Sequence, residues 1–380
     1  MRNVKFGKPM IGNEEREAVM DVLSDDILVH GPKATEFEKS FSKYVKGGKS
    51  VSVSSCTAAL HLSYFHYEIG KGDEVIVPAQ SHVATVHAVE LAGATPVFVD
   101  AELETGNMDL DQIEEVITER TKAISVVHFL GMPVNMDRIK SVSEKYNLRV
   151  IEDCALSVGA TYKGIHTGLF GDTGCFSFYP VKHFTTAEGG MVLCKNPDDA
   201  DSISRKRAFG VDRVASERKI PGIYDVDRLG YNYRMNEIQA AIGIEQLKKV
   251  NSFINKREEN YFHLMNGLNE IDEIELFKST NGEYKSSYYC LSVILSDRLA
   301  GKRFDIVTEL NNRGVGTSVY YPKAIPEFSY YQEKYGFKNG QFPNAARISN
   351  QSIAFPVGPH LDIDDMDYIV ENLKQVLANY

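Results

Sequence analysis

The sequence has few cysteines, and none lie in the spacing typical of a structural zinc site. The five cysteines in 380 residues are an odd number, widely scattered, and form no C-x-x-C pair. Disulfide frameworks and zinc sites both need paired or clustered thiols, so this distribution argues against either. We therefore predict no metal and expect the cysteines to be small, reduced residues of the core.

The chain also lacks an excess of positive charge and any long apolar run. It has 42 Lys and Arg against 52 Asp and Glu, a formal net charge of −10. Nucleic-acid binding relies on basic side chains that displace counterions from phosphates, so we expect no nucleic-acid partner. The first residues are charged, and no apolar run approaches the length of a membrane span. We predict a cytoplasmic protein with no membrane partner.

What the sequence does contain is an alternation of strand-like and helix-like segments. The strand-like runs are mostly continuous apolar strings, typical of strands buried on both faces. They lie at 50–55, 74–79, 95–101, 122–129, 148–154, 175–179 and 190–195. Between them, apolar residues three and four apart predict amphipathic helices at 57–69, 82–93, 110–120 and 136–147. This order predicts an α/β fold, with a mainly parallel sheet between helices.

The pattern changes near Asn236. One apolar stripe predicts a long helix that runs most of the way to Asn266. Beyond it, the sequence predicts strands at 288–296 and 316–322 and helices at 303–314 and 362–380. A chain of this length exceeds one ordinary core. We therefore predict a large domain over residues 1–249 and a smaller C-terminal α+β domain over 250–380.

Ligands of open α/β sheets collect at the carboxyl ends of strands, and three segments fall at such ends. In SSCTAAL (54–60) a strand turns into a helix whose N-terminus suits a phosphate, although the Walker pattern G-x-x-x-x-G-K-[ST] is absent. A plain helix cap by Thr57 is the alternative. In VIEDCALSVGA (150–160), Asp153 could cap a following helix or face a cationic ligand.

The third segment is CFSFYPVKHFTTAEGGMV (175–192). Ser177 precedes Lys182 by five positions, so both could reach one cofactor, although a lone loop lysine is more often solvated. A phosphate cradle, an aspartate for a pyridinium proton and a lysine for a Schiff base together predict a pyridoxal-phosphate site.

Seven ordered blocks along the chain carry a family resemblance. Among them are GDEVIVPAQSHVATVHAVELAGATPVFVD (72–100), VIEDCALSVGATYKG (150–164), GDTGCFSFYPVKHFTTAEGGMV (171–192) and LGYNYRMNEIQAAIGIEQL (229–247). The sequence resembles the DegT/DnrJ/EryC1/StrS family of sugar aminotransferases, which are fold-type I pyridoxal-phosphate enzymes. The resemblance implies a large domain like that of aspartate aminotransferase, with a seven-stranded sheet, and a pyridoxal 5′-phosphate cofactor.

The resemblance also implies roles for single residues. Lys182 matches the lysine that forms an imine with the cofactor, and Asp153 matches the aspartate paired with the pyridine nitrogen. Contacts to the cofactor phosphate are implied for Thr57, Ala58 and Ser177, and for Asn232 across a dimer interface. His82 takes the place of an aromatic ring against the cofactor face, with a satisfied loop histidine as the alternative.

One position departs from the family pattern. Leu156 stands where a polar side chain near the cofactor's phenolic oxygen is common, so that contact must come from elsewhere or from water. The C-terminal residues Tyr320, Tyr321, Lys323 and His360 are candidates for substrate contacts, but none is assigned.

By resemblance, the reaction transfers an amino group from L-glutamate to a nucleotide-linked keto-sugar in a homodimer with shared active sites. The amino-sugar would serve a surface polysaccharide, such as the O-antigen of lipopolysaccharide, or a glycosylated metabolite. Two alternatives stay open. A dehydratase branch of the family has histidine in place of the lysine, but the residue six positions before Glu188 is Lys182, with His183 one position too late. A non-catalytic regulator that binds the cofactor or a sugar nucleotide is the other.

Overall fold

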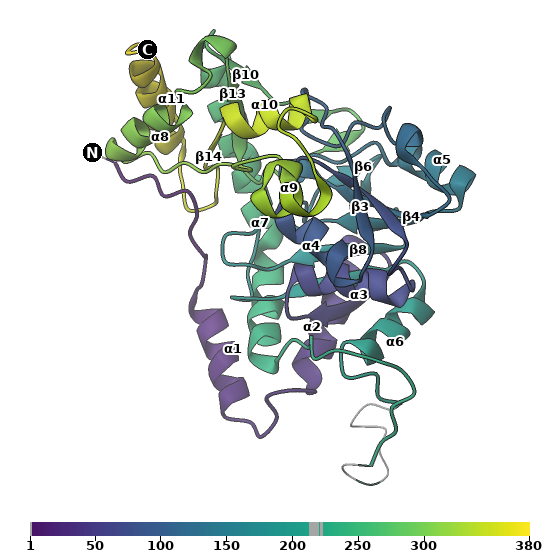
Figure 1. Ribbon diagram of the computed structural model, residues 1–380. Helices are drawn as coiled ribbons and strands as arrows, with labels where there is room; N and C mark the ends of the chain where they lie inside the picture. Colours follow the sequence, from purple (N-terminus) through teal and green to yellow (C-terminus); the bar gives the residue numbers. More distant parts are fainter. Residues whose placement is uncertain (1, 213–219, 221–222) are drawn as a thin grey trace.

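A seven-stranded sheet forms the centre of the large body of the molecule (Figure 1). The computed structural model describes residues 2–212, 220 and 223–380. The strands, in sheet order, are β1 (Lys49–Val53), β9 (Gly190–Cys194), β8 (Thr173–Ser177), β5 (Arg149–Asp153), β4 (Thr121–Val127), β2 (Glu74–Pro78) and β3 (Thr95–Val99). Neighbours from β8 to β3 pair parallel, and β9 is antiparallel to both β1 and β8. The predicted mainly parallel sheet is confirmed.

Helices cover both faces of this sheet, which explains the continuous apolar strings. In β2, Val75 and Val77 pack in one apolar cluster with α3 (Cys56–His66) and α4 (Val83–Leu91), whereas Ile76 packs in another with the start of α5 (Met136–Tyr146). Alternate side chains of a strand point to opposite faces, so both faces need apolar residues. The helices of this body are α1 (Asn13–Leu23), α2 (Pro32–Val45), α3 (Cys56–His66), α4 (Val83–Leu91), α5 (Met136–Tyr146) and α6 (Pro197–Lys206).

The long helix α7 (Glu237–Leu268) leads from this body toward the C-terminal elements. It begins at a capping box in which Asn236 and Gln239 bond each other's backbone N–H groups. It packs against α1 and α2 and also against α11 (Ile363–Leu377). The predicted boundary at residues 249 and 250 falls inside α7, and the two-domain division stays a prediction.

The C-terminal part builds a three-stranded sheet of β10 (Ile274–Leu276), β13 (Leu291–Leu295) and β14 (Ser352–Phe355). Its helices are α8 (Arg303–Asn312), α9 (Ser329–Tyr335), α10 (Pro343–Gln351) and α11 (Ile363–Leu377). A small sheet joins β6 (Thr161–Tyr162) and β7 (Ile165–His166) to β11 (Thr280–Asn281) and β12 (Tyr284–Lys285).

Two predicted elements are wrong. The predicted helix at 110–120 contains only a single 3-10 turn, Glu114–Val116. Asp109 explains part of this, because its side chain accepts the backbone N–H of Asp111 and so competes with helical bonding. The predicted strand at 316–322 is reduced to one bridge, in which Ser318 pairs with Ala354 of β14.

All five cysteines are buried and free, as the sequence predicts. Within the described part of the chain, no helix combines the length and apolarity needed to cross a membrane.

Candidate active site

A cavity of about 340 Å³ opens at the carboxyl ends of β2, β4, β5 and β8. It brings together residues from segments more than 100 positions apart in sequence. Of the predicted site residues, it is lined by Thr57, His82, Asp153, Leu156, Ser177 and Lys182. Ala58 is buried behind this lining, and Asn232 lies outside it.

The N-terminus of α3 forms one end of the cavity. Ser55 caps the helix by accepting the N–H of Ala58 at 3.1 Å, so the alternative of a cap by Thr57 is wrong. Thr57 lies in the first turn and lines the cavity. The helix dipole and the first-turn N–H groups favour an anion here. Because the N–H of Ala58 is held by Ser55, a phosphate contact at Ala58 requires the Ser55 side chain to turn away.

Gly190, the first residue of β9, allows the strand to approach this helix end closely. A Cβ at position 190 would lie 2.4 Å from the carbonyl carbon of Ser55 and 2.7 Å from the nitrogen of Cys56. No side chain fits at such distances, so the second glycine of the AEGG segment is required by packing. Ser177, at the end of β8, is opposite Gly190 in the sheet register.

Asp153 ends β5 with its carboxylate at the cavity wall. Oδ1 accepts the N–H of Ala155 at 3.0 Å, and Oδ2 accepts the hydroxyl of Thr85 at 2.8 Å. The residues after Asp153 form turns, so the alternative of a helix cap is wrong. A buried carboxylate at this place can pair with a protonated ring nitrogen.

Lys182 lies on the loop after β8, with its amine 5.4 Å from the centre of the Tyr289 ring. Burial lowers the pKa of the Lys182 amine, and the nearby Cys56, Asp153 and Cys290 oppose this effect. A lysine with a lowered pKa has more of the neutral amine that attacks carbonyl groups. The expectation of a solvated loop lysine does not describe this position.

His183 points away from the cavity. Its Nε2 lies 3.1 Å from the carbonyl oxygen of Ser287, and its side chain is buried. Burial lowers the pKa of His183 well below its ordinary value, and the charge of Arg257 adds to this. Adjacent basic residues therefore face different surroundings.

His82 serves first as the N-cap of α4, where its Nδ1 accepts the N–H of Ala84 at 3.1 Å. Its ring lies 5.5 Å from that of Tyr321, at the cavity. Burial, and then the charge of Lys182, lower the pKa of His82. The imidazole is therefore both satisfied by the cap and available at the cavity.

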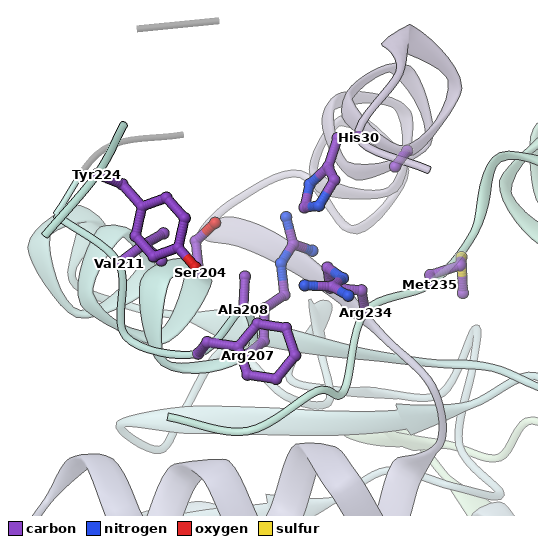
Figure 2. Close-up of a pocket in the computed structure, with 10 residues that line it drawn as sticks. His30, Ser204, Arg207, Ala208, Val211, Tyr224, Arg234 and Met235 are labelled. Carbon is purple, nitrogen blue, oxygen red and sulfur yellow. The ribbon is translucent and has the colours of Figure 1, made fainter. Parts of the chain in front are cut away.

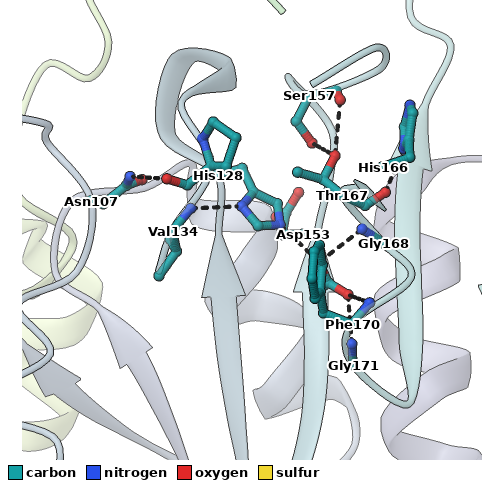
Figure 3. Close-up of polar contacts among 12 residues, drawn as sticks. Asn107, His128, Val134, Asp153, Ser157, His166, Thr167, Gly168, Phe170 and Gly171 are labelled. Carbon is teal, nitrogen blue, oxygen red and sulfur yellow. Dashed lines mark hydrogen bonds and ion pairs between the residues drawn. The ribbon is translucent and has the colours of Figure 1, made fainter. Parts of the chain in front are cut away.

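Behind the cavity, a buried network holds the end of β5 in place (Figure 3). Glu152 accepts the N–H groups of Gly168, Phe170 and Gly171, and His128 Nε2 lies 2.9 Å from it. Burial alone would raise the pKa of Glu152, but His128 and these N–H groups hold it below its ordinary value. His128, Glu152 and Cys154 offer ligand atoms within 4.8 Å of one another, but protein donors already occupy Glu152.

Asn232 lies at the surface in a separate region. Its backbone bridges to Ala208, whose side chain lines a second cavity of about 240 Å³. Figure 2 shows Arg207 and Arg234 side by side in this cavity. Arg207 is paired with Glu38 at 2.6 Å, and burial and the charge of Arg207 lower the pKa of Arg234. Asn232 is thus not brought to the cavity that holds Lys182 within one chain.

Two cavity residues, Tyr179 and Tyr289, could not be found from the sequence. Tyr179, Tyr289, Tyr320 and Tyr321 line the cavity, and the hydroxyls of Tyr289 and Tyr320 lie 2.9 Å apart. Of the unassigned candidates, Tyr320 and Tyr321 reach the site. Lys323 and His360 are not in the lining, and His360 Nε2 lies 2.9 Å from the carbonyl oxygen of Lys5. Tyr289 has no sequence signal, because only the fold brings the segment before β13 to the loop that carries Lys182.

The donor set fits a phosphorylated pyridine aldehyde. The α3 N-terminus suits the phosphate, the Asp153 carboxylate suits the ring nitrogen, and the Lys182 amine suits the aldehyde. The sheet order and this set of groups define the class of aminotransferase-like pyridoxal-phosphate enzymes.

The chain belongs to the DegT/DnrJ/EryC1/StrS aminotransferase family, whose sequence profile matches residues 9–374. Aminotransferases of this family depend on pyridoxal 5′-phosphate, so the predicted cofactor is confirmed.

Comparison with known proteins gives matches over nearly the whole chain. The spore coat polysaccharide biosynthesis protein SpsC of Bacillus subtilis is 35% identical over 98% of this chain and 96% of its own. Spr1654 of Streptococcus pneumoniae, in its PMP form, has a TM-score of 0.93 and 31% identity, covering 98% of this chain and 99% of its own. The sugar aminotransferase CalS13 of Micromonospora echinospora has a TM-score of 0.89 and 29% identity, covering 98% and 99%.

Proposed function

We propose that the protein transfers an amino group from L-glutamate to a keto-sugar carried on a nucleotide. The observation that supports this most is the meeting of Lys182, Asp153 and the α3 N-terminus in one cavity. A sugar acceptor is supported by CalS13, named a sugar aminotransferase, and by SpsC, named for polysaccharide biosynthesis.

Each residue has a defined task in this proposal. When bound, pyridoxal phosphate supplies an aldehyde that takes up the amino group and a ring that accepts electrons from the donor's α-carbon. Lys182 binds the aldehyde, and its released amine moves a proton between the donor's α-carbon and the cofactor carbon that bears nitrogen. Asp153 holds the proton on the ring nitrogen. Thr57, Ser177 and, once Ser55 turns, Ala58 hold the phosphate.

A homodimer with shared active sites is part of the proposal. Among described residues, Lys182 is the only lysine or arginine that lines the cavity, so the phosphate end has no basic side chain of its own. Asn232 is exposed, and we assign it to the phosphate of the partner's site. A surface that a second chain covers is supported by exposed apolar side chains at Met20, Leu23, Ile27, Phe209 and Leu229.

We assign the enzyme to the cytoplasm. The formal net charge of −10 disfavours a nucleic-acid partner but does not forbid one small anionic substrate in a local pocket. We assign the product of the enzyme to a surface polysaccharide, such as O-antigen, or to a glycosylated metabolite.

The test is turnover of purified protein with glutamate and a panel of nucleotide keto-sugars. Bound cofactor should absorb light, glutamate should bleach that absorbance, and a keto-sugar should restore it with release of an amino-sugar. Dehydrated product without glutamate consumption would instead favour the dehydratase, although Lys182 rather than His183 lines the cavity. No bound cofactor and no turnover would favour the regulator.

A further inference from the structure

Asp153 is held by a chain of two buried hydroxyl groups. Its Oδ2 lies 2.8 Å from Thr85 Oγ1, and Thr85 Oγ1 lies 2.8 Å from Ser81 Oγ. An ionised carboxylate only accepts hydrogen bonds, so Thr85 must donate its proton to Asp153. The oxygen of Thr85 is then free to accept from Ser81. The direction of the chain is therefore fixed, from Ser81 to Thr85 to Asp153.

Both hydroxyl groups are out of water. Thr85 is fully buried and Ser81 is 2% exposed. Hydrogen bonds to charged groups in buried surroundings are stronger than those at the surface. Thr85 lies in the first turn of α4, where a threonine often bonds its own helix backbone. Its hydroxyl bonds only Ser81 and Asp153 among the described contacts, so it does not stabilise α4 in that way.

The two hydroxyls come from a different part of the sheet than Asp153. Ser81 and Thr85 follow β2, whereas Asp153 ends β5, and β4 lies between these strands. The N–H of Ala155 holds the other carboxylate oxygen from the turn after β5. With one oxygen held from each side, the carboxylate cannot rotate about its terminal bond.

We propose that Thr85, supported by Ser81, is a positioning residue that aims the Asp153 carboxylate at the ring nitrogen of the cofactor. The inference rests on the role proposed for Asp153 above. The turn that begins α4 thus does two things at the cavity, because His82 caps the helix at the cavity wall while Thr85 fixes the carboxylate.

The test compares variants of the holoenzyme. Thr85→Val keeps the shape and removes the donor, whereas Thr85→Ser keeps the hydroxyl. We expect Thr85→Val to weaken cofactor binding and to lower the rate of bleaching by saturating glutamate, each about tenfold, with Thr85→Ser within about threefold of wild type. The pH dependence of the bound cofactor's absorbance should shift in Thr85→Val and not in Thr85→Ser. In cofactor binding and bleaching rate, Ser81→Ala should fall between Thr85→Val and Thr85→Ser.

Thr167→Val is the matched control. Thr167 is also fully buried, and its hydroxyl donates to the carbonyl oxygen of Ser157 at 3.0 Å (Figure 3) and, among the described contacts, makes no bond to Asp153. It should lower stability without changing cofactor binding or the absorbance profile. If Thr85→Val matches wild type within about twofold in both cofactor binding and absorbance profile, the inference is wrong. If Thr85→Val does not fold, Ser81→Ala decides the question. Cofactor binding and an absorbance profile like those of wild type would overturn the inference, whereas a partial loss of cofactor binding would support it.

Asp153→Asn separates this inference from the proposed function. Full turnover in Asp153→Asn would remove the proposed role of Asp153 itself. A severe loss in Asp153→Asn with none in Thr85→Val would leave the function standing and remove only the positioning role. In the Asp153→Asn background, adding Thr85→Val should change little, because coupled residues are not additive.

Discussion

At the residue scale, the neighbours Lys182 and His183 show how the backbone sorts two basic side chains. Lys182 lines the cavity with its amine near Tyr289, while His183 is turned to the carbonyl oxygen of Ser287. The two residues lie in a turn and bend after β8, where their side chains face different surroundings, so of the two only Lys182 lines the cavity. Counting six positions back from Glu188 in the sequence also selects Lys182, and this spacing is independent of the position of its side chain in the cavity.

Replacing these neighbours tests that division. Lys182→Ala should lower turnover by about a thousandfold or more, since both the covalent link and the proton carrier are lost, while the fold remains. His183→Gln is the control, and it should retain most of the turnover because His183 does not line the cavity. Steady-state rates and circular dichroism would check this. Normal turnover by Lys182→Ala would exclude the proposed mechanism.

The lowered pKa of Lys182 also predicts a pH effect on stability. The unfolded chain binds this proton up to its ordinary pKa near 10.5, whereas the folded chain releases it at lower pH. Between the two values the unfolded state binds more protons, so the stability of the cofactor-free protein rises with pH. Lys182→Met should therefore raise Tm most at neutral pH, and less as pH approaches 10.5. Thermal unfolding of both proteins from pH 7 to 10 measures this, and a gain independent of pH would contradict it.

At the element scale, the N-terminus of α3 must serve both the helix and the ligand. Ser55 satisfies the N–H of Ala58, whereas Thr57 faces the cavity from the first turn. Gly190 brings β9 against the same backbone, so the helix end is packed from one side and open on the other.

Variants of Ser55 and Thr57 should separate the effect on protein stability from the effect on cofactor binding. Ser55→Ala removes the cap and should lower the free energy of unfolding by about 1 kcal/mol, with little loss of cofactor affinity because it frees the N–H of Ala58. Thr57→Val should weaken cofactor binding about tenfold and leave the stability of the cofactor-free protein nearly unchanged. Cofactor titration and thermal unfolding provide the two measurements. Equal effects of both variants on both measurements would argue against this division.

Gly190 offers a packing test of the same element. Gly190→Ala should destabilise the protein by about 1–3 kcal/mol and weaken cofactor binding, because the new methyl group displaces the helix end. Gly282→Ala is the control, since a Cβ at this exposed position meets nothing within 4 Å. Denaturant unfolding compares the two. A neutral Gly190→Ala would show that β9 and α3 can separate at no cost.

The elements that the sequence predicts are those whose signals are local. Strand-like runs, most of them continuous apolar strings, predicted all seven strands of the large sheet, because burial on both faces favours apolar residues at successive positions. The helix predicted at 110–120 was wrong, because the Asp109 side chain accepts a backbone N–H in a turn that apolar periodicity does not reveal. Lys182, Asp153 and Thr57 lie at strand ends and were predicted together. Tyr289 and Thr85 were not, because their roles depend on contacts between distant segments.

At the scale of the whole molecule, the proposed dimer would complete the proposed phosphate site. The cavity has a helix N-terminus and hydroxyls, yet within the described residues no arginine lines it and Lys182 is its only lysine. Asn232 lies on the surface of the same chain, near exposed apolar side chains at Phe209 and Leu229. A symmetric pair of chains can cover such a surface and complete both sites at once.

Mixed dimers test whether Asn232 acts across that interface. Lys182→Ala and Asn232→Asp should each be poorly active alone, the second because a carboxylate repels the cofactor phosphate. In a dimer of one chain of each, the site with Lys182 receives the unchanged Asn232 of the other chain and should work. Random mixing in equal amounts makes about half of the dimers mixed, so about a quarter of wild-type activity should return. If Asn232 acted within its own chain, every site would carry one defect and mixing would restore nothing.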